Sequence, residues 1–338
     1  MHIIVIRLSA MGDVAMAVPV IKAVLMQHPH VQVTFVSNAF FAPLFKGIER
    51  CNFYPVYTKG THKGLKGIWK LYRALAQLNA DAVADLHAVL RSAILCNLFL
   101  LSGKKVAVID KGRSEKKKLT LKEHKDLKQL PTSHERYAAV FAGLGLPVSI
   151  QDKNLVAAKE TIPSSIIRFI QPGKKLIAVA PFAQHNEKMY PLFKMKAFLM
   201  ELSKRDDVQL LFFGAPGSEA ALLKEWEHEI PSSLNVAGKI SFAEELQLIS
   251  NVNVMISMDS ANMHLASIYG VPVVSIWGAT HPFAGFYGWQ QDEENIVQVD
   301  LHCRPCSVFG NIPCYRGDHA CMHMITTLML LQKTQQFL

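Results

Sequence analysis

The chain has 338 residues, of which 50% are hydrophobic and 19% charged, an ordinary globular composition that excludes a disordered or fibrous protein. This length suggests two domains or one large one, and no apolar run approaches the roughly 20 residues of a membrane-spanning helix. The formal net charge of +9 favours anionic partners such as nucleic acid, phosphorylated lipid head groups or nucleotides, although a basic and inert surface would give the same value.

The first residues do not have the pattern of a targeting segment. The apolar run at residues 2–6 is interrupted by Arg7, and it lacks the basic start and long apolar stretch of a signal peptide. We therefore expect a cytoplasmic protein. In that compartment disulfides are rare, so the six cysteines are expected to be reduced.

The first half of the chain alternates predicted strands and helices. Residues 2–8 are apolar and β-branched, as in a buried parallel strand, and the loop 9–13 leads into a helix with apolar residues at helical spacing. This alternation predicts a parallel sheet covered by helices on both faces. The further strands are expected at 31–36, 53–57, 82–86 and 105–109, and the further helices at 39–46, 65–78, 89–101 and 134–144.

A second series of the same kind follows a stretch with several proline, glycine and serine residues, 157–175, which is the candidate linker. The sequence therefore predicts two doubly wound, Rossmann-like α/β domains, residues 1–160 and 161–338, that face each other across a cleft. The last helix is expected to pack back on the first domain. Strands are expected at 176–180, 208–213, 234–236, 254–258 and 273–277, and helices at 193–204, 218–229, 242–250 and 263–269.

Ligands of open α/β sheets bind beyond the carboxyl ends of the strands, so the loops at those ends are the candidate site loops. The first of them contains Gly12, which permits a tight turn, and Asp13, which opens a helix. Asp13 has two interpretations: a helix cap, which the spacing alone favours, or a general base that deprotonates an acceptor hydroxyl. The loop lacks the GxGxxG pattern of a dinucleotide site.

Two loops in the second half have residues that suit a diphosphate. Lys188 lies just before the helix that Pro191 opens, where its charge would add to that of a helix N-terminus; the alternative is a solvated lysine. Asp259 or Ser260 could cap the helix that follows them, and its free backbone N–H groups can hold phosphate oxygens. His264 falls one turn into that helix, where a packed or capping role is the commoner one.

Four cysteines gather near the end of the sequence, at Cys303, Cys306, Cys314 and Cys321. A CxxC pair with two further cysteines can form a tetrahedral zinc site. The second pair is not a CxxC, so reduced thiols that pack a short tail, or a redox-sensitive loop, remain the alternatives.

As a set, these segments resemble glycosyltransferase family 9, which contains the ADP-heptose:lipopolysaccharide heptosyltransferases. The residues Arg7–Val14 resemble the opening motif of the family, and Lys188–Pro191 its lysine–aromatic–proline segment. The other matching segments, in the same order and at similar separations over nearly the whole chain, are Asp85–His87 with Arg91-Ser92, Asp259–Ala266, Gly278–Thr280 and the cysteine-rich segment. Two positions depart from the family pattern: Ala261, where glycine is usual, and Tyr190, where tryptophan is frequent.

The resemblance implies a GT-B fold and an inverting, metal-independent glycosyl transfer with Asp13 as the general base and no cofactor. The expected donor is ADP-heptose, and the expected acceptor is the anionic lipid A and core oligosaccharide of lipopolysaccharide, met at the inner face of the inner membrane. The implied donor-binding residues, in the C-terminal domain, are Lys188, Asp259, Ser260, Ala261, Asn262, His264, Gly278 and Thr280. The implied acceptor-binding residues, in the N-terminal domain, are Ser9, Gly12, Lys63, Lys66, Arg91 and Arg113.

Two other functions stay open from the sequence. One is a different enzyme on the same fold, such as a nucleotide-sugar epimerase or a glycosyltransferase with another donor sugar. The other is a basic nucleotide- or nucleic-acid-binding module without catalysis. Nucleic-acid binding calls for aromatic residues among the basic ones, and residues 104–128 contain none, so we expect no nucleic-acid partner.

Overall fold

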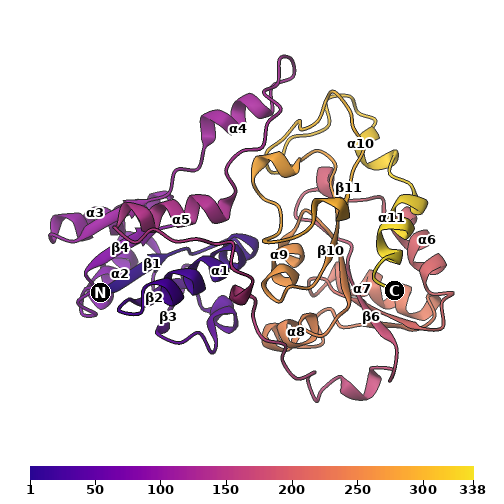
Figure 1. Cartoon of the computed structure of the whole chain (residues 1–338), viewed down its shortest axis with the longest axis horizontal. Helices are drawn as coiled ribbons and strands as arrows, with labels where there is room; N and C mark the ends of the chain where they lie inside the picture. Colours follow the sequence, from indigo (N-terminus) through magenta and orange to yellow (C-terminus); the bar gives the residue numbers. More distant parts are fainter. The chain divides into compact units, whose positions relative to one another are not determined.

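The computed structural model describes residues 1–338 and shows an α/β protein with two parallel sheets, each in a compact unit of its own (Figure 1). Unit 1 comprises residues 1–111 and 131–155, and unit 2 comprises residues 112–130 and 156–338. The expected division at residue 160 lies near residues 155 and 156, where the chain passes from unit 1 to unit 2 for the last time. The grouping of residues 112–130 with the C-terminal half was not expected. None of the helices combines the length and the apolar composition of a membrane-spanning segment.

The sheet of unit 1 has five parallel strands in the order β3-β2-β1-β4-β5. The central strand, β1, pairs on both sides, with Ile3 opposite Val33 of β2 and opposite Ala82 of β4. Its side chains are therefore covered on both faces, which explains its unbroken apolar sequence. The strands are β1 (His2–Ile6), β2 (Gln32–Asn38), β3 (Cys51–Val56), β4 (Ala82–Asp85) and β5 (Lys105–Val108).

Two pairs of helices cover this sheet (Figure 1). Helices α1 (Met11–Gln27) and α5 (Ser133–Gly143) pack against each other. Helices α2 (Gly64–Ala76) and α3 (Leu90–Leu101) pack together on the face to which Ile4 and Ile6 point. The segment expected as a helix at 39–46 is the 3₁₀ helix η1 (Ala39–Phe45), and a second 3₁₀ turn is η2 (Lys153–Leu155).

The sheet of unit 2 has six parallel strands in the order β11-β10-β9-β6-β7-β8. They are β6 (Lys175–Ala180), β7 (Val208–Phe212), β8 (Ser233–Asn235), β9 (Val254–Met258), β10 (Val273–Ile276) and β11 (Ile296–Val297). The α-helices are α4 (Arg113–Leu119), α6 (Leu192–Leu202), α7 (Ser218–Glu229), α8 (Phe242–Ile249), α9 (Ala261–Ile268), α10 (Ala320–His323) and α11 (Thr327–Gln335). The 3₁₀ helices are η3 (Ile167–Phe169), η4 (Asn186–Lys188), η5 (Pro282–Ala284) and η6 (Glu293–Asn295).

The last helix, α11, lies inside unit 2. It packs against α6, β10 and β11, and Leu330 on its inner side is fully buried in the core of this unit. The expectation that it packs back on the first domain stays a prediction.

The segment 112–130 is held in unit 2 by apolar contacts. Leu119 and Leu130 are buried against Ala284, and the Leu130 N–H donates to the Phe283 carbonyl at 2.9 Å. The ammonium group of Lys116 lies 4.1 Å from the centre of a nearby aromatic ring, that of Phe286. Such a cation–π contact adds to the apolar burial.

In each sheet the strand order reverses once. The chain runs from β1 outward to β2 and β3 and then places β4 on the other side of β1; in unit 2 it runs from β6 to β7 and β8 and then places β9 beside β6. Ligands of doubly wound sheets bind at the carboxyl ends of the strands at this reversal. The loops after β1, β4, β6 and β9 are thus the candidate site loops, and all four were expected from the sequence.

Candidate active site

In unit 1, the side chain of Asp13 lies just beyond the carboxyl end of β1, in the first turn of α1. Its carboxylate accepts the Ala10 N–H at 3.3 Å and forms an ion pair with the guanidinium of Arg7. Ala10, not Asp13, is the N-cap residue, so Asp13 caps the helix from within its first turn. The Asp13 side chain remains 29% exposed, so capping leaves part of the carboxylate available for chemistry.

The buried side chain of Arg7 fixes this carboxylate in place. Its guanidinium also donates to the Leu86 carbonyl at 2.7 Å and lies 6.0 Å from the centre of the Tyr137 ring. The Tyr137 hydroxyl in turn donates to the backbone carbonyl of Asp13 at 3.2 Å. Neither Arg7, which belongs to the opening motif, nor Tyr137 was assigned a role from the sequence, although a charged residue at the end of an apolar strand was a signal for Arg7.

The loop after β4 adds a neutral imidazole beside Asp13 and Arg7. Burial and the charge of Arg7 lower the pKa of His87 to about 4, so the ring is uncharged at pH 7. Asp85, which precedes it, is fully buried, and its carboxylate accepts the N–H groups of His87 and Ala88 at 2.8 and 3.0 Å. Asp85 therefore shapes the loop rather than serving as an exposed acid.

The residues predicted to bind the acceptor do not all belong to one unit. Arg113 is the first residue of α4 and lies in unit 2, whereas the others lie in unit 1. Within unit 1, Arg91 donates to the His62 carbonyl at 3.2 Å and so links the start of α3 to the start of α2. The predicted acceptor residues of unit 1 are Ser9, Gly12, Lys63, Lys66 and Arg91, all partly or fully exposed.

Three side chains meet in a buried cluster in unit 2. The Lys188 ammonium lies 2.9 Å from a carboxylate oxygen of Asp259, and the Thr280 hydroxyl donates to the same oxygen at 2.8 Å. These residues follow β6, β9 and β10, three neighbouring strands, whose carboxyl ends share one edge of the sheet. With side chains only 15% and 7% exposed, Lys188 and Asp259 are not the solvated lysine and helix cap of the alternative interpretations.

Helix α9 begins beside this cluster without a side-chain cap. Ser260 occupies the N-cap position, but its hydroxyl is bonded to that of Ser257 at 2.9 Å. The first-turn N–H groups, which include those of Ala261 and Asn262, are therefore not capped by a side chain, and such groups bind water or a ligand. His264 is buried in the second turn of the same helix.

Residues 301–323 pack over the loops that carry the Lys188–Asp259–Thr280 cluster. The buried guanidinium of Arg304 donates to the carbonyls of Gly278 and Thr280, which fixes that turn. A Cβ atom on Gly310 would lie 2.3 Å from Cγ of Lys188, so only glycine fits there. The sequence predicted neither contact, because nothing local distinguishes Arg304 or Gly310 from their neighbours.

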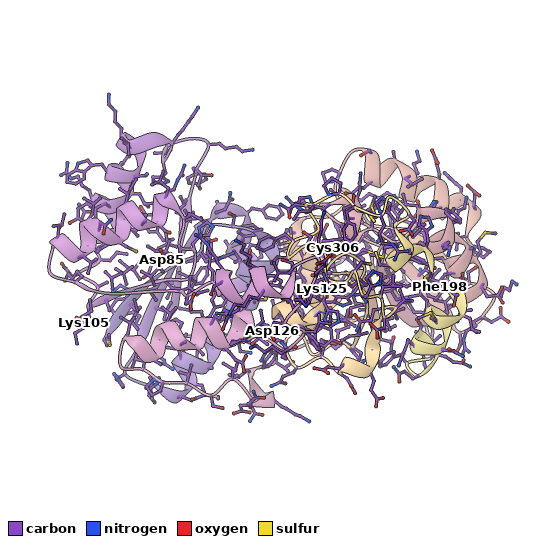
Figure 2. All side chains as sticks on the ribbon, turned by 90° about the horizontal axis from the view of Figure 1, so that it is seen from above. Asp85, Lys105, Lys125, Asp126, Phe198 and Cys306 are labelled. Carbon is purple, nitrogen blue, oxygen red and sulfur yellow. The ribbon has the colours of Figure 1, made fainter.

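The cysteine-rich segment contains only free thiols. Lys125 donates to the carbonyls of Cys303 and Pro305 at 3.2 and 2.8 Å, and Figure 2 shows Lys125 beside Cys306. Burial raises the pKa of Cys321 to about 11, so this thiol is protonated at neutral pH. No group of three or more His, Cys, Asp or Glu side chains is arranged to hold a metal ion, and the zinc site stays a prediction.

Comparison with known proteins decides the family. The family model described as "Glycosyltransferase family 9 (heptosyltransferase)" matches residues 68–312. The chain belongs to glycosyltransferase family 9. The lipopolysaccharide core heptosyltransferase OpsX of Haemophilus influenzae is 24% identical over 282 residues, which are 82% of this chain and 79% of that protein. Lipooligosaccharide heptosyltransferase 2 of Campylobacter jejuni serotype O:2 is 24% identical over 340 residues, 97% of this chain and 95% of that protein.

Solved structures share the fold of this family 9 glycosyltransferase. ADP-heptose lipopolysaccharide heptosyltransferase II of Escherichia coli superposes with a TM-score of 0.71 at 18% identity, over 100% of this chain and 98% of that chain. The Escherichia coli heptosyltransferase WaaC with ADP superposes with a TM-score of 0.67 at 16% identity, over 100% of both chains. These similarities confirm the predicted GT-B type of α/β fold with two parallel sheets.

Proposed function

We propose that this enzyme transfers heptose from ADP-heptose to the inner core of lipopolysaccharide, with inversion at the anomeric carbon and without a metal ion in the reaction. The observation that carries the proposal is the buried Lys188–Asp259–Thr280 cluster beside the uncapped first turn of α9. Support comes from the relatives, which are named as heptosyltransferases of lipopolysaccharide or lipooligosaccharide, and from a structural neighbour that is described with ADP.

On this proposal, unit 2 binds the sugar nucleotide. The Lys188 ammonium and the N–H groups of Ala261 and Asn262 stabilise the negative charge that grows on the ADP leaving group as its bond to the sugar breaks. Asp259 is fixed by Lys188 and Thr280 and accepts hydrogen bonds from sugar hydroxyls. Its charge is balanced by Lys188, so it does not repel the diphosphate as an unpaired carboxylate would.

Unit 1 supplies the base. Asp13 takes the proton from the acceptor hydroxyl while that oxygen bonds to the anomeric carbon and ADP leaves from the opposite face of the sugar. Arg7 holds the carboxylate and Tyr137 holds its backbone, so the base keeps one orientation. His87 is neutral at pH 7 and adds no further positive charge beside the base.

The acceptor is anionic and lipid-linked on this proposal. Lys63, Lys66 and Arg91 bind its phosphate groups, and Ser9 and Gly12 line the loop that presents the base. The enzyme therefore works at the inner face of the inner membrane. Arg113 of α4 remains a prediction as a further contact.

A calorimetric titration of ADP in the presence of EDTA, with UDP and GDP for comparison, tests the donor site. We expect selective ADP binding that survives chelation and that Lys188→Ala weakens by about 10- to 100-fold, because a charge-assisted contact is lost. Lys204→Ala is the matched control, since Lys204 is an exposed lysine of unit 2 that pairs only with Glu201 on the same helix end.

The alternatives predict different titrations. Binding of UDP or GDP in place of ADP would reject the heptose donor and leave glycosyl transfer standing. Absence of any nucleotide binding would reject the donor site and favour the basic binding module, for which a salt-dependent shift of DNA in a gel is the signature.

A further inference from the structure

Helices α2 and α3 of unit 1 expose large apolar side chains to solvent. On α2, Leu65 is 74% and Trp69 is 52% exposed; on α3, Leu90 is 81% and Leu101 is 86% exposed. A single exposed leucine is normal on a protein surface, but a group of large apolar side chains on adjoining helices indicates an interaction site. We call the surface formed by these four residues and the neighbouring basic residues the α2–α3 face. The basic residues are Lys66, Lys70 and Arg73 of α2 and Arg91 of α3.

The two helices present one continuous surface. The ring of Trp69 lies 5.3 Å from that of Tyr72, which in turn lies 5.1 Å from the ring of Phe99 on α3. At the other end, Arg91 of α3 donates to the carbonyl of His62, just before α2. The helices also pack side by side along their length (Figure 1).

The charge on this face has one sign. On α2 an apolar row at positions 65, 69, 72 and 76 runs beside a basic row at positions 66, 70 and 73, because residues three and four apart lie on the same side of a helix. Residues 57–80 contain five lysine or arginine residues and no aspartate or glutamate. Helix α3 carries a single charge, that of Arg91.

This combination selects the partner. A second copy of the chain would bring two basic faces together, and nucleic acid would leave the leucines in water. An anionic lipid bilayer suits both the basic and the apolar residues of this face. Its head groups pair with lysine and arginine, and its interfacial region accepts leucine and, preferentially, tryptophan.

We propose that the α2–α3 face docks the enzyme on an anionic lipid bilayer, an inference that rests on the proposed function only in assuming a lipid-linked acceptor. The predicted acceptor residues Lys63, Lys66 and Arg91 lie at the starts of the same two helices. Docking therefore holds them at the level of the lipid head groups, where the phosphates of such an acceptor lie. Each basic residue near an anionic surface strengthens binding by about fivefold, and moderate salt weakens it.

Intrinsic fluorescence can follow the docking, because Trp69 is the exposed member of the four tryptophans and Trp226, Trp277 and Trp289 are buried. The full chain is mixed with vesicles of phosphatidylglycerol and phosphatidylethanolamine, or of phosphatidylcholine alone. We expect a blue shift of the emission and co-flotation with the anionic vesicles only. Trp69→Phe abolishes the shift and keeps the flotation.

Variants locate the face. Leu90→Gln with Leu101→Gln should weaken flotation by about tenfold or more, because two exposed apolar side chains no longer enter the bilayer. Lys70→Glu with Arg73→Glu should also weaken flotation by about tenfold or more, because glutamate side chains are repelled by anionic head groups. Leu328→Gln changes another exposed leucine, on α11 of unit 2, at 61%; it is the control and should float as the wild type does.

Flotation of the leucine pair variant at the level of the wild type would overturn the proposal. So would an equal affinity for neutral vesicles, or a wild-type dimer that the leucine pair variant turns into a monomer. Turnover of a delipidated, water-soluble acceptor separates this test from the proposed function. If only docking is lost, the leucine pair variant turns over this acceptor as the wild type does. If the wild type itself does not turn over the acceptor, the proposed function is rejected and the flotation result still stands.

Discussion

At the scale of single residues, Asp13 combines a structural contact with the proposed chemistry. Asp13→Asn keeps an oxygen that can accept the Ala10 N–H but cannot take a proton, so we expect kcat to fall by about 10²- to 10⁴-fold. Because the donor cluster lies in unit 2, ADP affinity should stay unchanged. Initial rates with ADP-heptose and an ADP titration measure the two effects.

The control for Asp13 is Asp81→Asn, which alters another carboxylate of unit 1 that accepts a backbone N–H, that of His2. A melting curve is needed for both variants, since Asp13→Asn also leaves the buried charge of Arg7 without its counter-ion. An Asp13→Asn enzyme that is folded and has wild-type kcat would show that another group is the base.

Glu245 on α8 should make the stability of the protein depend on pH. Burial raises its pKa from 4.5 to about 7, so the folded protein binds this proton more tightly than the unfolded chain does. The contribution of this proton to the free energy of unfolding is complete below pH 4.5 and is lost as the pH rises through 7. In Glu245→Gln the loss is absent, so the free energy of unfolding of the wild type relative to the variant should fall by about 1–3 kcal/mol between pH 4.5 and 7.5.

Denaturant unfolding at several pH values measures this difference. The half-buried His87 and His281 have lowered pKa values of about 4 and act in the opposite direction, destabilising the folded state as the pH falls below about 6.5. Their effect is the same in both proteins and cancels in the comparison. A constant difference across the range would contradict the shift of Glu245.

At the scale of elements, the segment 301–323 should control donor binding through Gly310. In Gly310→Ala the new methyl group would displace Lys188, so ADP affinity should fall by about tenfold, comparable with the loss of one charge-assisted contact. Gly317→Ala is a close control, because Gly310 and Gly317 have φ values of 74° and 75°, and a Cβ on Gly317 has no neighbour within 4 Å. Equal ADP affinity in the two variants would contradict the proposed role of Gly310.

Elements with a clear hydrophobic period were predictable, and those formed by contacts distant in sequence were not. The apolar strands β1, β6 and β9 and the helices after them were expected within a few residues. The two-residue strand β11 is too short to show a period. Helix α4 is the lysine-rich sequence Arg113–Leu119, and its Leu119 is buried against Ala284, far along the chain. The segment at 39–46 contains Pro43, which lacks a backbone N–H, and forms a 3₁₀ helix instead.

At the scale of the whole molecule, the fold class and the site loops were predictable because alternating strands and helices imply a parallel sheet, and such a sheet gathers its loops at one edge. The side-chain partners were not. The contacts of Arg7 with Leu86, of Lys188 with Asp259 and of Arg304 with Gly278 join residues far apart in the sequence, and no local spacing encodes them. The pairing of Asp259 with Lys188 shows how a residue that local spacing would make a helix cap becomes part of a buried side-chain cluster instead.

The course of the chain through its two units has a consequence for biosynthesis. Residues 112–130 leave the ribosome long before Phe283 and Cys303, the partners of Leu130 and Lys125 in unit 2. At about 5–20 residues per second, this segment waits on the order of ten seconds or more with Leu119 and Leu130 uncovered. The same course matters for chimeras between family members. A chimera that exchanges only the residues after 155 would leave α4 with foreign partners. A chimera that takes residues 112–130 from the same protein as the residues after 155 would preserve the native contacts.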